Sequence, residues 1–318
     1  MNFVILCPYL AKTGGPEALH QLGNAFSELG VKSQIWYTLN EDKEILKDIK
    51  SEDLSITAIK FTDRNLIPDD YLIYNPNIAE EIIISAETVI VIPESMLDWV
   101  KYFRKNKILI WWLSVDNSFK TLAPSIINSN ELRLNNVFHA YQSEYARNFL
   151  KSMQFERTFP LSDYTITRNV KATNKSKICI SAIPKVIFNT NYIAEYLKKE
   201  TGLDIVFIKG LTRDQVYKAF EESYCYIDLG NFPGKDRMTR EAALCGCIPI
   251  VLNVGGCEYN IPSSLKIEIS QINSIPFITK TVIENYSDYM ASLNSFIFDI
   301  KSEKVNFIKE VAKISNSF

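Results

Sequence analysis

The chain has 318 residues, of which 47% are hydrophobic, and its formal net charge is −2 at pH 7. A chain of this length and apolar content exceeds one ordinary hydrophobic core, so the composition predicts two domains. The near-neutral charge excludes the broad basic surface of a general nucleic-acid-binding protein. We therefore expect no nucleic-acid partner, and any anion-binding site must be local.

The N-terminal segment begins with a strand-like run, residues 3–7, and lacks the basic segment, long apolar core and cleavage site of a secretory signal. No stretch approaches the roughly 20 apolar residues that span a bilayer. These features predict a cytoplasmic protein. Three of the 6 cysteines fall in apolar strand-like runs, which predicts buried thiols, and the cysteine and histidine spacing predicts no structural metal.

The first half of the chain alternates strand-like and helix-like segments. After the strand at 3–7 and a glycine-containing loop, apolar residues recur on one helical face over 16–29. Pro16 suits the first turn of this helix and Gly30 suits its end. The later segments are strands at 33–37, 88–92, 108–113 and 137–141 and helices at 96–104 and 143–153.

A second alternating region follows residues 161–176, whose polar composition is typical of a linker. Its strands are expected at 178–181, 205–208, 225–229 and 248–252, and its helices at 192–199, 213–222, 240–245 and from 278 onward. This pattern predicts an α/β fold with two tandem Rossmann-like, doubly wound domains facing a cleft. We expect an N-terminal domain over residues 1–165 and a C-terminal domain over residues 166–318.

The most informative stretch covers residues 228–246, where a strand, a Gly/Pro loop and a helix meet. Three cations, Lys235, Arg237 and Arg240, gather at the entrance of this helix. The entrance already carries partial positive charge from unpaired N–H groups and the helix dipole, so these cations predict that an anion from outside completes the site. A phosphate is the natural candidate. Asp236 is expected to cap the helix rather than to contact substrate.

Two windows of the chain resemble the GT-B glycosyltransferases that use nucleotide sugars, a group with bacterial surface-polysaccharide members. One window is Thr13-Gly-Gly-Pro-Glu-Ala-Leu-His-Gln-Leu22. The other is Arg240-Glu-Ala-Ala-Leu-Cys-Gly-Cys-Ile-Pro-Ile-Val251, which is similar to the signature Glu-Ala-x-x-x-Gly-x-Pro-x-Val of that family. The resemblance implies transfer of a sugar from a nucleotide diphosphate donor to a hydroxyl group of a glycan or lipid-linked saccharide, without a metal or other cofactor.

The resemblance also implies roles for residues of the second window. Glu241 is expected to bind the ribose hydroxyls of the donor, because a carboxylate accepts two hydrogen bonds without a competing donor. A helical ion pair between Arg237 and Glu241 is the alternative, in the weaker orientation. Lys235 and Arg237 are expected to stabilise the charge on the departing diphosphate, with a solvated basic loop as the alternative. The chain has no Asp-x-Asp metal clamp.

Further donor-binding positions follow other strands. The resemblance implies that Lys185 binds the diphosphate, with a surface lysine as the alternative. Gly14 and Gly15 lie where a strand turns into a helix, so the backbone can approach a ligand. The resemblance implies that this ligand is the transferred sugar, and a tight turn is the alternative. Lys209 and Arg213 are weaker candidates.

The sequence departs from the family pattern at Pro233. Retaining members carry a second glutamate eight positions before the ribose-binding one, where it contacts the donor sugar, and here Pro233 stands in that place. Donor identity and stereochemical outcome are therefore open. A nucleotide-sugar epimerase and a non-catalytic relative that binds glycans or nucleotide sugars are the alternatives.

On the acceptor side, Glu94 and Asp116 each follow a strand, and either carboxylate can deprotonate an attacking hydroxyl. His20 is a third candidate for this base. Solvated or packed side chains are the alternative for all three. Trp111 and Trp112 are adjacent in a strand and face opposite sides, so core packing is expected for at least one of them.

A small basic cluster is compatible with peripheral contact between the protein and an anionic inner membrane surface that carries a lipid-linked acceptor. A solvated helix end is the preferred interpretation. The cluster consists of Lys101, Arg104, Lys105 and Lys107.

Overall fold

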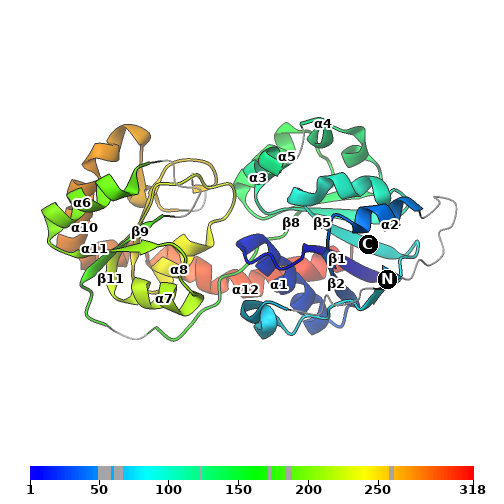
Figure 1. Cartoon of the computed structure of the whole chain (residues 1–318), viewed down its shortest axis with the longest axis horizontal. Coiled ribbons are helices and arrows are strands. Elements are labelled where there is room, and N and C mark those ends of the chain that lie inside the picture. The colour runs from blue at the N-terminus through cyan, green and yellow to red at the C-terminus, as the bar shows by residue number, and fades with distance from the viewer. Residues whose placement is uncertain (49–58, 61–66, 122–123, 171–172, 183–187, 258–260) are drawn as a thin grey trace. The chain divides into compact units, whose positions relative to one another are not determined.

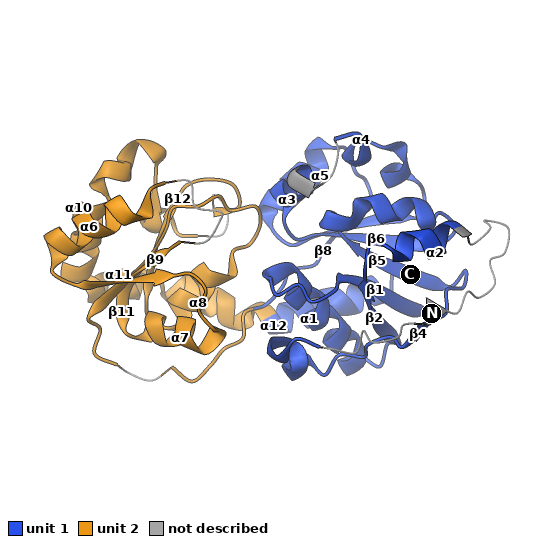
Figure 2. Cartoon of the chain, in the orientation of Figure 1, with its two compact units in different colours: residues 1–164, 304–318 blue, residues 165–303 orange. Residues whose placement is uncertain are grey.

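The structure is a computed structural model, and it describes residues 1–48, 59–60, 67–121, 124–170, 173–182, 188–257 and 261–318. The chain divides into two compact units, Met1–Tyr164 with Lys304–Phe318 and Thr165–Glu303 (Figures 1 and 2). The chain passes from one unit to the other at Tyr164–Thr165 and at Glu303–Lys304.

The second unit ends earlier than the C-terminal domain expected over 166–318. Residues 304–318 belong instead to the first unit. Their apolar side chains explain the difference, because Phe307 and Val311 are fully buried and the Phe307 ring stacks on Trp111 at 6.3 Å between centroids. The helical spacing of these residues was visible in the sequence, but not the core that buries them.

The first unit contains a six-stranded parallel sheet in the order β2-β1-β5-β6-β7-β8. Its strands β1, β5 and β6 are almost completely buried, which accounts for their continuous apolar runs. The strands are β1 (Asn2–Pro8), β2 (Ser33–Thr38), β5 (Thr88–Pro93), β6 (Lys107–Trp112), β7 (Val137–Tyr141) and β8 (Thr158–Pro160), with a separate antiparallel pair, β3 (Ile59–Lys60) and β4 (Glu81–Ile82).

The helices of the first unit connect these strands. The segment expected as an α-helix over 96–104 is instead η2 (Glu94–Tyr102), a pair of 3₁₀ segments interrupted by non-helical backbone at Met96. Trp111 and Trp112 are both fully buried, so both pack in the core. The other helices are α1 (Gly14–Glu28), α2 (Asp42–Asp48), η1 (Asp69–Tyr74), α3 (Val115–Thr121), α4 (Pro124–Ile127), η3 (Asn130–Arg133), α5 (Glu144–Ser152) and the last part of α12 (Asn294–Ser315).

The second unit contains a five-stranded parallel sheet in the order β10-β9-β11-β12-β13. Its strands are β9 (Lys177–Ser181), β10 (Asp204–Ile208), β11 (Ser223–Asp228), β12 (Ile248–Leu252) and β13 (Lys266–Ile267). Its helices are α6 (Thr190–Thr201), α7 (Arg213–Glu221), α8 (Arg237–Leu244), η4 (Ser263–Leu265), η5 (Ile269–Ser274), α10 (Ile275–Glu284), α11 (Tyr286–Ser292) and the first part of α12.

Helices cover both faces of this second sheet (Figure 1). Ile178 and Ile180 of β9 belong to one apolar cluster, with residues of α6 and α10, whereas Cys179 between them belongs to another, with residues of α7 and α8. Side chains that alternate between two cores are the mark of a doubly wound sheet. All 6 cysteines are free and buried, which confirms the burial predicted from the three that lie in apolar strand-like runs.

Candidate functional site

The strand order reverses next to the first strand of each sheet, between β1 and β5 and between β9 and β11. Ligands of open α/β sheets bind at the carboxyl ends of strands where the order reverses. In the second unit, the loop that leaves β11 at Asp228 and enters α8 at Arg237 starts from such a point. This loop is the one in which the sequence analysis placed an anion site.

The loop is held tightly at its start and its middle. Asp228 is fully buried and accepts hydrogen bonds from Tyr226 Oη (2.8 Å) and Gly230 N (3.0 Å). Farther along, Gly256 N donates to Phe232 O at 2.6 Å. A β-carbon at Gly255 would collide with that same carbonyl, and Gly255 has a φ of +58°. Glycine is therefore required at position 255, where the loop after β12 meets the loop between β11 and α8.

Asp236 caps α8, as expected, because its Oδ1 accepts a hydrogen bond from Thr239 N at 3.3 Å. Arg240, one turn into the helix, is buried, with an exposed fraction of 2%. Its Nε donates to Asp236 O and its Nη2 to Lys235 O, each at 3.2 Å. Arg240 therefore holds the loop against the helix.

An internal anion, Glu303 of α12, meets two of the three cations at the α8 entrance. Its Oε1 lies 2.7 Å from Lys235 Nζ, and its Oε2 lies 2.7 Å from Arg240 Nη1. Thr165 N also donates to Oε2, at 2.9 Å. Glu303 thus already supplies one negative charge to an entrance where the sequence predicts an anion from outside. No local pattern indicated Glu303, which lies 63 positions from Arg240 in the chain.

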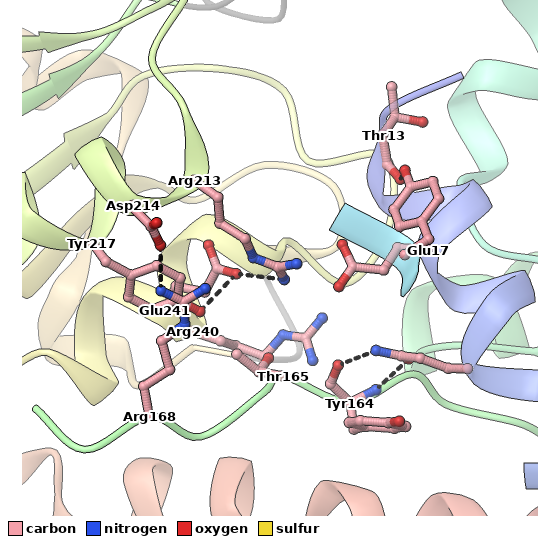
Figure 3. Close-up of polar contacts among 12 residues, drawn as sticks. Thr13, Glu17, Tyr164, Thr165, Arg168, Arg213, Asp214, Tyr217, Arg240 and Glu241 are labelled. Atoms are coloured by element: carbon pink, nitrogen blue, oxygen red, sulfur yellow. Dashed lines mark hydrogen bonds and ion pairs between the residues drawn. The ribbon is translucent and has the colours of Figure 1, made fainter. Parts of the chain in front are cut away.

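Glu241 lies on α8 and is 6% exposed. Figure 3 shows Tyr217 and Arg213 of α7 reaching its carboxylate, where Tyr217 Oη donates to Oε1 at 3.1 Å and Arg213 Nη2 lies 3.7 Å from the same oxygen. Burial, followed by the negative charge of Glu241, raises the pKa of Tyr217, so this hydroxyl stays protonated and continues to donate. The two contacts fix the orientation of the Glu241 carboxylate.

Arg168 is another residue of this region that the sequence did not indicate, like Glu303 and Tyr217. Its guanidinium lies 4.3 Å from the centroid of the Tyr217 ring, and its Nη1 pairs with Asp214 Oδ1 at 2.7 Å (Figure 3). Arg168 thereby stacks against the Tyr217 ring while Asp214 holds its guanidinium. The stacking positions the phenol that holds Glu241.

The remaining donor-side candidates are placed as follows. Lys185 lies outside the described residues. Arg237 is half-buried and is the first residue of α8, while Lys209 is exposed at the end of β10. Of the cations proposed from the sequence, the structure therefore brings Lys235 and Arg237 to one helix entrance and Arg213 to Glu241.

In the first unit, Gly14 and Gly15 begin α1, which follows β1 after a loop over residues 9–13. Neither has a positive φ. A β-carbon at Gly14 would have no neighbour within 4 Å, and one at Gly15 would only touch Leu113 Cδ1 at 3.9 Å. The turn therefore does not require glycine at either position, and the open space lies where the sequence placed a ligand.

His20 lies in α1 and is fully buried. Its Nδ1 lies 2.6 Å from Pro16 O, and its Nε2 lies 2.7 Å from Tyr37 Oη. A carbonyl can only accept, so Nδ1 carries the proton and Nε2 accepts from Tyr37. Burial lowers the pKa of His20. Both ring nitrogens thus serve internal bonds, and this geometry leaves neither of them for a substrate hydroxyl.

Glu94 is 4% exposed and follows β5. Its Oε2 accepts a hydrogen bond from Leu113 N, at the end of β6, at 2.9 Å. Burial raises its pKa to about 7, although backbone hydrogen bonds from Leu113 and Ser114 act in the opposite direction. A carboxyl group that titrates near neutral pH has the property required of a general base.

Asp116, the other carboxylate expected here, is half-buried in α3 and accepts a hydrogen bond from Tyr145 Oη at 2.7 Å. Glu17 is a further carboxylate that the sequence analysis did not single out. It lies in the first turn of α1, is 5% exposed and accepts a hydrogen bond from Tyr74 Oη at 2.6 Å. Its position two residues after Gly15, in the first turn of the helix, was the available signal.

The basic cluster, which runs from the end of η2 to the first residue of β6, has internal contacts. Arg104 pairs with Glu131, and Lys107 Nζ donates to Phe318 O at 2.6 Å. Among the described helices, none is long and apolar enough to cross a bilayer. Nor do the described residues contain a group of three or more His, Cys, Asp or Glu side chains placed to hold a metal ion.

Neither the known family models nor the curated proteins include a match to this chain. Solved structures do match. HepE from Anabaena, in complex with UDP and glucose, has a TM-score of 0.67 with 9% identity over 100% of both chains. The pneumococcal O-GlcNAc transferase GtfA, in complex with UDP and GlcNAc, has a TM-score of 0.65 with 7% identity over 99% of both chains.

A third match is a variant of TarM from S. aureus in complex with fondaparinux, α-GlcNAc-glycerol and UDP. It has a TM-score of 0.63 with 10% identity, over 97% of this chain and 100% of the other. At such low identities the likeness concerns the fold, and it extends over both units. The expected fold class is confirmed: this chain has the GT-B fold, with two Rossmann-like α/β domains.

Proposed function

We propose that this protein is a glycosyltransferase that moves a sugar from a nucleotide diphosphate donor to a hydroxyl group of a glycan or lipid-linked saccharide. One observation carries the proposal. Glu241, oriented by Tyr217 and Arg213, lies one helical turn after Arg237 and the cationic entrance of α8. A carboxylate suited to ribose hydroxyls therefore stands on the helix whose entrance carries cations suited to a diphosphate.

The chemistry of transfer follows from these positions. As the bond between sugar and diphosphate breaks, negative charge develops on the diphosphate, and Lys235 and Arg237 stabilise it as it forms. Because side chains supply this positive charge, the proposal requires no metal ion or other cofactor. The open space beside Gly14 at the start of α1 suits close approach of the transferred sugar to the backbone.

Uridine diphosphate is the donor nucleotide to test first, because HepE, GtfA and TarM were each solved with UDP bound. For the base that activates the acceptor hydroxyl, Glu94 is the best candidate, since its pKa is raised to about 7. Asp116 is the second candidate. His20 is a weaker one, because its ring nitrogens bond Pro16 and Tyr37.

A second candidate function is binding of a nucleotide sugar or glycan without catalysis. Pro233 favours it, because this position in the loop before α8 has no carboxylate to contact the donor sugar. Incubation with a broad panel of donors and acceptors separates the two functions, since only the enzyme forms a product. Products formed from the donor alone would indicate an epimerase instead.

We also propose that the protein works in the cytoplasm and meets a lipid-linked acceptor at the membrane surface through Lys101, Lys105 and their neighbours. This part predicts binding to vesicles that contain anionic lipids and weaker binding at high salt. Cosedimentation that is equal for neutral and anionic vesicles would contradict it.

Calorimetric titration with UDP, GDP, ADP, CDP and dTDP tests the nucleotide site. We expect one of them to bind the intact protein, and Glu241→Ala to weaken that binding about 10- to 100-fold, since hydrogen bonds to a charged group contribute about 1.5–3 kcal/mol. Glu284→Ala, at an exposed position of α10, is the control and should bind normally. Failure of all five nucleotides to bind, or normal binding by Glu241→Ala, would contradict the assignment.

A further inference from the structure

Glu303 deepens the proposed donor site, because an anionic side chain already occupies the cationic entrance of α8. Its two oxygens lie 2.7 Å from Lys235 Nζ and 2.7 Å from Arg240 Nη1. The carboxylate is 8% exposed, so little solvent screens it. At this entrance, the Glu303 carboxylate therefore supplies the kind of negative charge that the sequence predicts from a phosphate.

The two cations are not equally bound to Glu303. Arg240 is enclosed, with a side chain 3% exposed and with Nε, Nη1 and Nη2 each donating to a partner in the second unit. Lys235 has a side chain 17% exposed and sits in the loop itself. An ammonium group has three donors on a flexible stem, so it can turn toward a ligand while Arg240 stays in place.

From these contacts we infer that Glu303 is an internal counter-ion that competes with the donor's diphosphate for Lys235 and thereby sets the affinity of the site for the nucleotide. The inference rests on the proposed function, since it assumes that the diphosphate binds at this loop. In the empty site, Glu303 neutralises Lys235 and holds it at the entrance of α8. When a diphosphate arrives, Lys235 turns to it, while Glu303 keeps its bonds to Arg240 and Thr165 N.

The same competition assists release of the product. After sugar transfer, the nucleoside diphosphate carries more negative charge than it did in the donor, and the fixed cations alone would retain it. The Glu303 carboxylate offers Lys235 an alternative partner at hydrogen-bond distance, so the ion pair re-forms as the product leaves. Glu303 acts through Lys235, and is in this sense a positioning residue.

Glu303→Gln tests the inference, because a counter-ion and a purely structural residue predict opposite changes in affinity for the nucleoside diphosphate. Glutamine keeps the size of the side chain and an acceptor for Thr165 N, but removes the negative charge. We expect the variant to bind UDP, or the nucleoside diphosphate that the wild type prefers, about 3- to 10-fold more tightly, because one opposing charge near the site is gone. Its affinity should also fall more steeply with salt. A purely structural role predicts the reverse, namely weaker binding by a loosened loop.

Two comparisons show whether the effect passes through Lys235. Glu310→Gln is the matched control, because Glu310 also lies on α12 and accepts a backbone hydrogen bond, from Ser162 N at 2.8 Å. It should bind UDP as the wild type does. When Lys235 is already replaced by glutamine, Glu303→Gln should raise the affinity for UDP at most about 2-fold, because Lys235 is no longer there for Glu303 and the diphosphate to compete for. A folded Glu303→Gln protein with unchanged or weaker affinity would overturn the inference.

If Glu303→Gln does not fold, Glu303→Asp replaces it. Aspartate keeps the charge but is one methylene shorter, so its carboxylate holds Lys235 less closely. Affinity tighter than that of the wild type supports the inference, and equal or weaker affinity overturns it.

Inorganic pyrophosphate separates failure of this inference from failure of the proposed function. If the wild type binds no nucleoside diphosphate, the proposed function fails. The counter-ion inference is then decided by the rise in Tm that pyrophosphate produces. A larger rise in Glu303→Gln than in the wild type supports competition for Lys235, and an equal or smaller rise refutes it.

Discussion

Because the carboxyl group of Glu94 is buried, we predict how the free energy of unfolding changes with pH. Burial raises its pKa from 4.5 to about 7, so the folded protein holds a proton that the unfolded chain releases. Stability therefore falls as the pH rises through the window between 4.5 and 7. At 1.36 kcal/mol for each pKa unit, the loss is about 3 kcal/mol once the group is fully ionised.

Two histidines act in the opposite direction within the same window. Burial lowers the pKa of His139 to about 4 and also lowers that of His20. These side chains stay neutral in the folded protein while the unfolded chain takes up protons below pH 6.5, so their effect is to raise stability with increasing pH. The wild-type profile alone therefore cannot display the contribution of Glu94.

Glu94→Gln isolates that contribution. The variant lacks the titrating group, so the difference in unfolding free energy between the variant and the wild type should grow by about 3 kcal/mol in favour of the variant from pH 4.5 to pH 8. Urea unfolding followed by tryptophan fluorescence suits this measurement. All 4 tryptophans, Trp36, Trp99, Trp111 and Trp112, lie in the first unit, as Glu94 does. The signal therefore reports on the unit that contains the substitution.

Glu87→Gln, at an exposed position of the same unit, provides the control and should show a difference that is constant with pH. A Glu94→Gln difference that is equally flat would refute the reasoning that burial raises this pKa. So would a difference that grows in favour of the wild type.

Two glycine substitutions test the loops of the candidate site. Gly255→Ala should lower the free energy of unfolding by about 1 kcal/mol for the left-handed backbone and by about 1–3 kcal/mol more for the collision with Phe232 O. The control Gly202→Ala also lies at positive φ but in open space, so it should show only the first loss. Chemical unfolding measures both, and equal losses would contradict the steric argument. Gly14→Ala should not destabilise the fold, because its β-carbon meets nothing within 4 Å, and yet lower kcat/KM at least about 10-fold if a sugar approaches this backbone. Unchanged kcat/KM would show that the open space at Gly14 is not used by substrate.

Local signals in the sequence determined much of the fold and part of the site. Uninterrupted apolar runs predicted the parallel strands, because a strand buried on both faces needs no polar side. Asp236 was correctly predicted as the cap of α8, since the position before a helix favours a short acceptor whatever the rest of the chain does. The same local logic located the loop that carries Lys235 and Arg237.

Tertiary structure alone decided which side chains meet across long separations. Glu303 reaches Lys235 and Arg240 only because the fold brings this part of α12 to the start of α8, and Tyr217 reaches Glu241 only because α7 lies beside that helix. The burial of His20 likewise follows from aromatic partners contributed by β2 and η1. The periodicity of a segment shows which of its faces is buried, but the partner of that face depends on contacts between distant segments, which no local pattern records.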